Sequence, residues 1–138
     1  MHAQTWGMYF ARMKPCSILV IDDEPALREI LSTVLADAGH RVVGAGNGKE
    51  ASKLLSASAF DVVLTDVIMP EKDGMQVISE LRKKFPGVRI IAMSGGGHVP
   101  RDQYLKIAKG LGAHAVLEKP FANQKLLETI EALAPSVA

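Results

Sequence analysis

Residues 17–45 read SILVIDDEPALREILSTVLADAGHRVVGA and contain two short apolar runs, 17–21 and 41–45, with a longer segment between them. Both runs are rich in Ile, Leu and Val, which favours strands. The segment between them has apolar residues at helical spacing, followed by Gly39 where a C-terminal cap would lie. Its apolar positions are Leu27, Ile30, Leu31, Val34, Leu35 and Ala38. The stretch therefore predicts a strand, a helix and a second, parallel strand.

The same alternation continues along the rest of the chain. Further apolar runs predict three more strands, at 61–65, 88–93 and 113–117. Stripes of apolar residues at helical spacing predict one helix after each of the later strands, within 51–55, 75–85, 104–111 and 126–133. We interpret these stripes as core-facing, and several of the runs lack the alternation of half-exposed strands. The pattern predicts an α/β fold with a five-stranded parallel sheet covered by helices on both faces.

The chain length of 138 residues fits one domain, which we place at residues 15–134. Residues 1–14 precede it as a lead-in, which is a flexible tail, a cloning remnant or an upstream start, since Met13 could also begin the natural chain. Residues 135–138 form a C-terminal tail. Because the last predicted helix ends close to the last residue, we expect a stand-alone domain without an attached output domain.

The composition excludes several classes of protein. The single cysteine, Cys16, rules out a disulfide scaffold. No apolar run approaches the roughly 18 residues of a membrane helix, and the first residues fit a secretory signal poorly. The net charge of +1 lacks the basic excess that non-specific nucleic-acid binding needs. We therefore expect a cytoplasmic protein that binds neither a membrane nor a nucleic acid.

Polar side chains follow four of the five predicted strands. Asp22, Asp23 and Glu24 come after the first strand, Asp66 after the third, Ser94 after the fourth and Lys119 after the fifth. In open parallel sheets the ligand lies beyond the carboxyl ends of the strands. We expect these side chains to converge at that edge.

The converging groups suit phosphoryl transfer. Carboxylate oxygens are ligands that Mg²⁺ prefers, and a carboxylate can also accept a phosphoryl group as a nucleophile. Lys119 and the hydroxyl group of Ser94 could then neutralise the transferred group. Each residue alone has a simpler explanation, because Asp22, Asp23 or Glu24 could cap the helix at Pro25 and Asp66 could belong to a turn. Their placement after four strands of one sheet favours the functional interpretation.

The motifs, taken together and in order, resemble the receiver domain of response regulators. They are IDDEP at 21–25, DVVLTDVIMP at 61–70, DG at 73–74, MSG at 93–95 and EKPF at 118–121, and they cover about residues 17–133. The resemblance implies a flavodoxin-like three-layer α/β/α sandwich with strand order 2-1-3-4-5. It also implies two-component signalling, with a histidine kinase or a histidine phosphotransfer protein as phosphodonor and a downstream protein target that the sequence does not identify.

The resemblance further implies a role for each matching residue. Asp66 corresponds to the phospho-acceptor. Asp23 corresponds to a direct Mg²⁺ ligand, Asp22 to a ligand acting through water, and the backbone carbonyl of Ile68 completes the protein's metal contacts. Ser94 corresponds to the switch hydroxyl. Lys119 corresponds to the lysine that pairs with the phosphoryl group and precedes a cis-proline.

One position departs from the family pattern and two other functions compete. Many receivers have an aromatic residue three positions before the lysine, where this chain has Val116, so we expect a weaker response there. An aspartate-nucleophile phosphatase would place a second acid two residues after Asp66, where this chain has Ile68. A degenerate receiver that only binds proteins would have lost the acceptor, the acid pair or the lysine. The glycines of residues 44–48 lack the spacing of a nucleotide loop.

Overall fold

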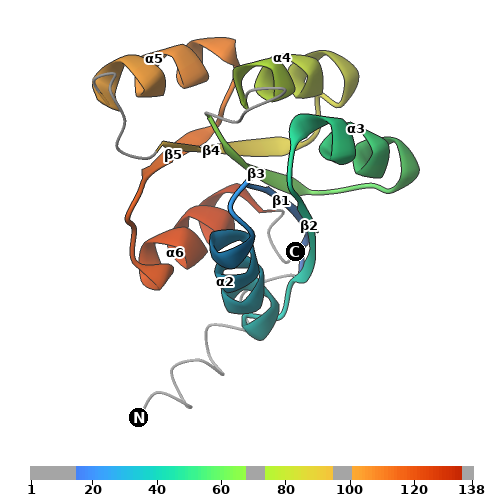
Figure 1. The fold of residues 1–138 in the computed structure, drawn as a ribbon, viewed down its shortest axis with the longest axis vertical. Helices are drawn as coiled ribbons and strands as arrows, with labels where there is room; N and C mark the ends of the chain where they lie inside the picture. The colour runs from blue at the N-terminus through green and yellow to red at the C-terminus, as the bar shows by residue number, and fades with distance from the viewer. Residues whose placement is uncertain (1–14, 68–73, 95–100, 135–138) are drawn as a thin grey trace.

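A five-stranded parallel sheet forms the centre of the molecule (Figure 1). The computed structural model describes residues 15–67, 74–94 and 101–134. The strand order is β2-β1-β3-β4-β5, and every neighbouring pair is parallel. The strands are β1 (Ser17–Ile21), β2 (Arg41–Ala45), β3 (Val62–Asp66), β4 (Arg89–Ser94) and β5 (Ala115–Glu118). The predicted sheet, its strand order and the flavodoxin-like topology are confirmed.

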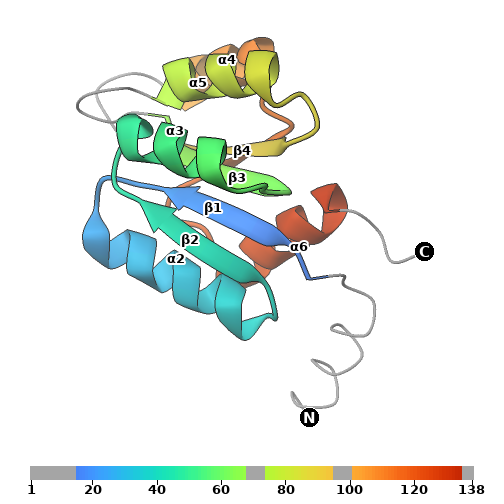
Figure 2. The ribbon, with the colours of Figure 1, turned by 90° about the vertical axis from the view of Figure 1, so that its right-hand side faces the viewer.

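Five helices cover the two faces of the sheet. They are α2 (Pro25–Asp37), α3 (Gly48–Ala57), α4 (Gly74–Lys84), α5 (Arg101–Leu111) and α6 (Asn123–Leu133). Figures 1 and 2 show α2 and α6 on one face and α3, α4 and α5 on the other. The predicted three-layer sandwich is therefore confirmed. No helix in the described ranges is long and apolar enough to cross a membrane.

The strands separate two apolar cores because successive side chains of a strand point to opposite faces. Leu19, Ile21 and Ile90 pack in the core beneath α3, α4 and α5. Ile18 and Ile91, their immediate neighbours, pack in the core beneath α2 and α6. The central strands are buried along nearly their whole length, which explains why their sequences lack alternation. The edge strand β2 alternates instead, and its outer side chains are exposed.

The predicted element boundaries were correct to within one or two residues for the strands. The runs predicted at 61–65, 88–93 and 113–117 appear as Val62–Asp66, Arg89–Ser94 and Ala115–Glu118. The largest difference lies before β5, where Ala113 lies in the turn that caps α5, because its N–H donates to the carbonyl of Ala108. Gly39, predicted to cap its helix, and Gly112, which follows α5, both have a positive φ, of 98° and 117°. The proposed lead-in and tail, residues 1–14 and 135–138, lie outside the described residues.

Candidate functional site

The register of the sheet brings the predicted site residues to one edge. Ile21 of β1 pairs with Thr65 of β3, so the next residues, Asp22 and Asp66, lie at the same level on adjacent strands. Ser94 ends β4 on the other side of β3, and its carbonyl oxygen accepts a hydrogen bond of 2.8 Å from the N–H of Lys119. The carboxyl ends of four neighbouring strands therefore deliver one polar group each.

Lys119 joins the two buried carboxylates of this edge. Its Nζ lies 3.0 Å from Oδ2 of Asp22 and 3.1 Å from Oδ2 of Asp66. Asp22 is completely buried and Asp66 is 7% exposed. An ammonium group that donates to both carboxylates offsets part of the cost of keeping them away from water. The Lys119–Pro120 peptide bond is cis, as the resemblance to receivers implies.

Asp22 is fixed by its main chain as well as by its side chain. Its N–H donates to the carbonyl of Ala45 at 3.1 Å, and its Oδ1 accepts from the N–H of Glu24 at 3.0 Å. Glu24 occupies the cap position of α2, yet its own side chain makes no capping hydrogen bond. Asp22 thus satisfies a free N–H at the start of α2 and binds Lys119 at the same time. The simpler capping explanation and the functional one both apply to this residue.

Asp23 completes an acidic cluster with Asp22 and Asp66. One oxygen from each of the three carboxylates can be chosen so that all lie within 4.8 Å of one another. Asp23 is exposed, whereas Asp22 already binds Lys119 and the start of α2. A set of carboxylate oxygens suits a hard divalent cation such as Mg²⁺, which keeps several water ligands. The residues present therefore fit the predicted ion.

Burial and neighbouring charges shift the protonation equilibria of the site. Burial raises the pKa of the Asp66 carboxyl group, and the negative charges of Asp22 and Asp23 add to this rise. The charge and hydrogen bond of Lys119 oppose it without cancelling it. Burial by itself would lower the pKa of Lys119, but its contacts with Asp22 and Asp66 outweigh this effect and the pKa is raised. The lysine therefore stays charged while the Asp66 carboxylate is held at some energetic cost.

Ser94 carries a polar atom whose hydrogen-bonding capacity is unused. Its side-chain Oγ is buried and has no hydrogen-bond partner within the described part of the chain. A buried hydroxyl group without a partner costs about 1–3 kcal/mol, so such groups are uncommon in folded proteins. Ser94 lies one position beyond Met93, the residue that pairs with Asp66. The hydroxyl group is therefore available to a new partner near the end of β3.

Two further expectations have different outcomes. Ile68, whose carbonyl the resemblance assigns to the metal, lies outside the described residues, and so do Gly95–Gly97 after Ser94. Val116 is described, and it is a half-buried residue that packs against the core beneath α3, α4 and α5. Val116, at the position that is aromatic in many receivers, therefore packs on the face of the sheet that α5 covers.

Arg28 is a residue that the sequence interpretation missed. Its Nη1 donates to the backbone carbonyl of Asp22 at 2.8 Å, from the first turns of α2. The IDDEP motif ends at Pro25. Arg28 follows it within the predicted helix, at a position where an exposed arginine without a specific role would fit equally well. The one available signal is the pair of glycines at the end of β2, Gly44 and Gly46, whose spacing does not fit a nucleotide loop.

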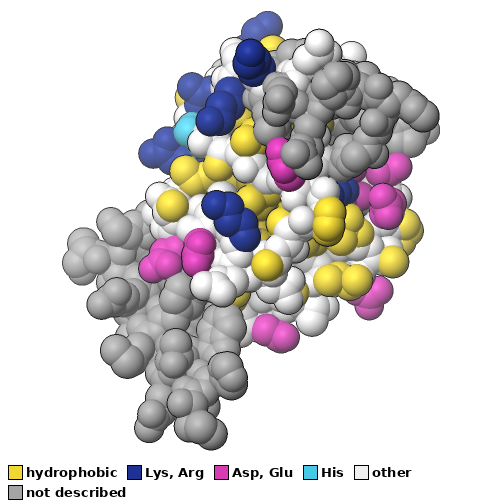
Figure 3. Space-filling view, turned by 90° about the vertical axis from the view of Figure 1, so that its left-hand side faces the viewer, with side chains coloured by type: hydrophobic (Ala, Val, Ile, Leu, Met, Phe, Trp, Pro, Cys, Tyr) yellow, Lys and Arg dark blue, Asp and Glu magenta, His cyan; other side chains and the backbone are white. Residues whose placement is uncertain are grey.

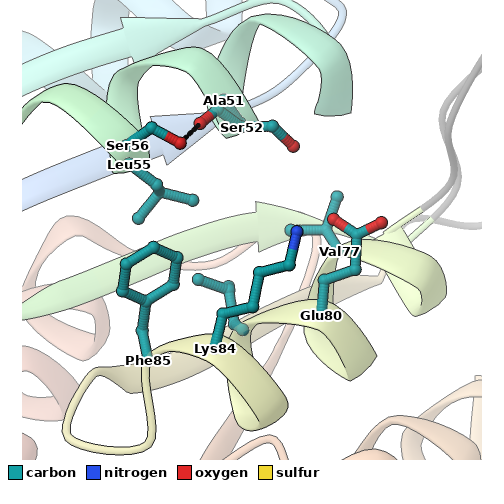
Figure 4. Close-up of a pocket in the computed structure, with 9 residues that line it drawn as sticks. Ala51, Ser52, Leu55, Ser56, Val77, Glu80, Lys84 and Phe85 are labelled. Atoms are coloured by element: carbon teal, nitrogen blue, oxygen red, sulfur yellow. Dashed lines mark hydrogen bonds between the residues drawn. The ribbon is translucent and has the colours of Figure 1, made fainter.

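A small cavity elsewhere in the molecule does not belong to the site. Figure 4 shows it between α3 and α4, with Lys84 and Glu80 on one side and Ser52 and Ser56 on the other. Its volume of about 40 Å³ is enough for a few water molecules. None of the residues that line it was predicted to be functional, and we assign no ligand to it.

The fold and the site define a class before any relative is considered: a doubly wound α/β protein with a lysine-bridged acidic cluster at the carboxyl edge of its sheet. The response regulator receiver domain family matches residues 18–131, and the chain belongs to this family. Receiver domains are phospho-accepting switches of two-component signalling. The resemblance seen in the sequence is thereby confirmed.

Relatives with known names support the same family. The transcriptional regulatory protein GlrR of Escherichia coli is 33% identical over 118 residues, which are 86% of this chain and 26% of that protein. The response regulator MprA of Mycolicibacterium vanbaalenii is 37% identical over 121 residues, again 86% of this chain but 50% of that protein. The chain thus spans a quarter to a half of the length of these relatives.

Solved structures show the same fold in longer and shorter proteins. Chemotaxis protein CheY4 of Vibrio cholerae has a TM-score of 0.77 and 29% identity, covering 87% of this chain and 99% of that chain. NtrX of Brucella abortus has a TM-score of 0.81 and 27% identity, covering 87% of this chain and 27% of that chain. The matched domain therefore makes up nearly all of one solved chain and about a quarter of the other. The expectation of a single-domain regulator stays a prediction.

Proposed function

We propose that Asp66 accepts a phosphoryl group from a histidine kinase or a histidine phosphotransfer protein in a Mg²⁺-dependent reaction. The protein would signal by phosphorylation-dependent docking to a partner protein, or by passing the group along a relay, as a single-domain regulator. The observation that carries this proposal is the bridge from Lys119 to Asp22 and Asp66, beside the third carboxylate of Asp23. This arrangement combines a nucleophile, a fixed cation and a set of metal ligands.

In the transfer step a carboxylate oxygen of Asp66 forms a bond to phosphorus while the bond from phosphorus to the donor's histidine nitrogen breaks. Lys119 remains protonated and neutralises charge on the transferred group, since its pKa is raised. The hydroxyl group of Ser94 donates to a phosphoryl oxygen. Mg²⁺, when bound, would stabilise negative charge on the phosphoryl oxygens. We assign Asp23, Asp66 and the carbonyl of Ile68 as its direct ligands, with Asp22 acting through water.

The first test compares Asp66→Asn with Asp61→Asn. Asp61 lies at the opposite end of the same strand region, where its Oδ2 accepts from the N–H of Ser17 at 2.9 Å. Incubation with acetyl phosphate and Mg²⁺ should add one phosphoryl group to the wild type and to Asp61→Asn, and none to Asp66→Asn, as measured by mass spectrometry. Full labelling of Asp66→Asn would refute the assignment. Continuous release of phosphate in large excess over protein would favour the phosphatase alternative.

The second test concerns the metal ligands. Asp23→Ala should weaken Mg²⁺ binding far more than Glu24→Ala, because Glu24 follows the acidic cluster and does not belong to it. Calorimetric titration gives both dissociation constants directly. Equal losses in the two variants would place the ligand motif one residue away from its proposed position.

The third test follows the signal away from the site. Beryllofluoride, which stands in for the phosphoryl group on Asp66, should change hydrogen exchange mainly across residues 94–112 and less around Val116. The reason is that Ser94 offers an unused hydroxyl group, whereas Val116 has no aromatic ring to move. Changes that are larger in β5 than in α5 would contradict this route.

A further inference from the structure

Arg28 connects α2 to the metal-binding loop through the main chain. The residue lies in the first turns of α2 and is half-buried. Its side chain reaches back to the end of β1, where Nη1 donates to the carbonyl oxygen of Asp22 at 2.8 Å. A hydrogen bond from a charged donor is about twice as strong as a neutral one. The contact is therefore a substantial restraint on the backbone beside the acid pair.

Two glycines, Gly44 in β2 and Gly46 in the turn after it, leave the space that this side chain occupies. A Cβ atom added at Gly44 would lie 3.1 Å from Cδ and 3.2 Å from Cγ of Arg28. A Cβ atom added at Gly46 would lie 3.2 Å from Nη1 itself. All three distances are tighter than ordinary van der Waals contact. Arg28 therefore lies along the end of β2 in a path that only small residues leave open.

The turn that carries Gly46 is held independently of Arg28. The N–H of Gly46 donates to Oε2 of Glu50 at 3.0 Å. The side chain of Asn47 caps α3 by accepting from the N–H of Glu50 at 2.8 Å. These two bonds fix the turn between β2 and α3 without a contribution from Arg28. The backbone against which Arg28 packs is therefore held in place by other residues.

From these contacts we propose that Arg28 is a positioning residue for the acid pair, which rests on the proposed Mg²⁺ site. The carbonyl of Asp22 and the N–H of Asp23 belong to one planar peptide group. Fixing the carbonyl oxygen therefore fixes the plane from which Asp23 departs. The N–H and both side-chain oxygens of Asp22 are already bonded to Ala45, Glu24 and Lys119. Arg28 supplies the remaining restraint, on the side that leads to Asp23.

The principal test is the Mg²⁺ affinity of Arg28→Met, which keeps much of the aliphatic length and removes the donor. Calorimetry should give a dissociation constant about tenfold higher than that of the wild type, the size expected for losing one charge-assisted hydrogen bond. Arg28→Lys, which keeps a donor, should restore part of the affinity. Arg41→Met is the control, because Arg41 is an exposed arginine at the opposite end of β2 and should leave the affinity unchanged.

A second test places pressure on the same contact from β2. Gly46→Ala should raise the dissociation constant in the wild-type background, because the added Cβ displaces Nη1. In the Arg28→Met background the same change should have little further effect, since no guanidinium is left to displace. Full additivity, or wild-type affinity in both single variants, would overturn the proposal. Should Arg28→Met fold poorly, the affinity of Gly46→Ala and of Arg28→Lys still decides.

A metal-free measurement separates this proposal from the proposed function. In amide NMR spectra without Mg²⁺, Arg28→Met should shift the Asp23 signal strongly, and Arg41→Met should not. An unmoved Asp23 signal contradicts the positioning role whatever the protein binds. Failure of the wild type to bind Mg²⁺ or to accept a phosphoryl group contradicts the proposed function instead, while the NMR result still reports on Arg28.

Discussion

The two ends of the sheet use their polar side chains in different ways. At the carboxyl end, two buried carboxylates share Lys119, and the hydroxyl group of Ser94 is buried without a partner in the described residues. At the amino end, His40 and His114 each accept a hydrogen bond at Nδ1 from a main-chain N–H, of Cys16 at 3.1 Å and of Ile90 at 3.0 Å. The carboxyl end thus contains buried polar groups that share a partner or have none in the described residues. At the amino end the two Nδ1 atoms accept hydrogen bonds from main-chain N–H groups beside the edge strands.

The amino end repeats one device at both edges. Each histidine follows a glycine-terminated helix and directly precedes an edge strand, β2 for His40 and β5 for His114. Each Nδ1 then accepts a hydrogen bond from a main-chain N–H of the adjacent inner segment. Nε2 of His40 is the exception, since it is buried without a partner in the described residues.

Positive charge also gathers near this end, as Figure 3 shows for one face of the molecule. Basic side chains in the last turns of α4 and α5, including Arg82 and Lys109, complement the partial negative charge of the helix ends. Burial lowers the pKa of His114, and the nearby charges of Arg89 and Arg82 lower it further. Burial also lowers the pKa of His40. Both rings are therefore kept neutral, as their acceptor role requires.

This difference suggests a criterion for recognising a site. A polar group that is fully used by the main chain stabilises the fold, whereas a buried group with unused or shared capacity marks the place where a ligand binds. The criterion distinguishes Ser94 and Asp66 from Asp61 and His114 without reference to any relative. His40 does not follow it, because its Nε2 is buried without a partner in the described residues. Four predictions test whether the two ends differ in this way.

The largest effect is expected for Lys119→Met at the carboxyl end. It leaves the carboxylates of Asp22 and Asp66 buried without their cation, which should lower the free energy of unfolding by about 3 kcal/mol at neutral pH. Urea denaturation measures this loss. Because a divalent cation can replace the missing charge, the loss should shrink in Mg²⁺. The control is Lys125→Met, an exposed lysine on α6, which should change stability little. A Lys119→Met loss as small as that of the control would show that the bridge contributes little.

The next effect concerns the histidines at the amino end. Because the pKa values of both are lowered in the folded protein, their contribution to stability is present above their ordinary value near 6.5 and is lost as pH falls through the folded values. The double variant His40→Asn/His114→Asn keeps an acceptor at each site without a titrating ring. Its stability should fall less steeply than that of the wild type between about pH 7 and pH 5. If the unfolding free energies of the wild type and the double variant, measured by urea titration, depended on pH in the same way, the acceptor role would be contradicted.

A smaller effect of opposite sign is expected for Asp66→Asn. The raised pKa of Asp66 means that its contribution favours folding below the ordinary value of 3.8 and that this contribution is lost as pH rises through the folded value. At neutral pH the carboxylate therefore weakens the fold, and asparagine should raise the urea midpoint without changing the slope of the transition. Asp61→Asn, at the amino end, should instead lower the midpoint slightly, because it exchanges the charge-assisted hydrogen bond from the N–H of Ser17 for a weaker neutral one. A lower midpoint for both variants would remove the distinction between the two ends.

The smallest effect is expected for Ser94→Ala. Its buried hydroxyl group has no partner in the described residues, so its removal should leave the free energy of unfolding unchanged or raise it by up to about 1 kcal/mol. Urea denaturation measures this change. Labelling of Asp66 by acetyl phosphate should persist because Lys119 remains. The hydrogen-exchange response of α5 to beryllofluoride should be blunted. A marked loss of stability would show that the Ser94 hydroxyl group already has a partner in the resting protein.

The sequence predicted the site where its residues follow strands. Asp66 and Lys119 could be placed because Asp66 ends the fully buried strand β3 and Lys119 directly follows the apolar run of β5, and the parallel sheet then brings them together. The strand boundaries were less accurate near β5, where the helix cap at Gly112 extends the turn. Side chains that bind the main chain were missed, because such contacts leave no periodic signal in the sequence.

Arg28 and His40 are the clearest examples of that limit. A helical arginine and a histidine after Gly39 fit many surroundings, and only the packing of α2 against β1 and β2 gives each its single main-chain partner. The glycines at 44 and 46 carried information about Arg28, but their meaning depends on which side chain crosses them. The role of Ile68 depends on a backbone carbonyl, which every residue type has, and so it came only from the resemblance.

The shared lysine has a consequence for the energetics of the switch. Because Lys119 is bound to Asp22 as well as to Asp66, a phosphoryl group on Asp66, as proposed, would share this ammonium group with Asp22. The part of its charge that Asp22 neutralises would reduce what the ammonium group contributes to the phosphorylated state. Phosphorylation would then bias the two states less than it would with a lysine that had no second carboxylate, and a docking partner could shift their ratio further.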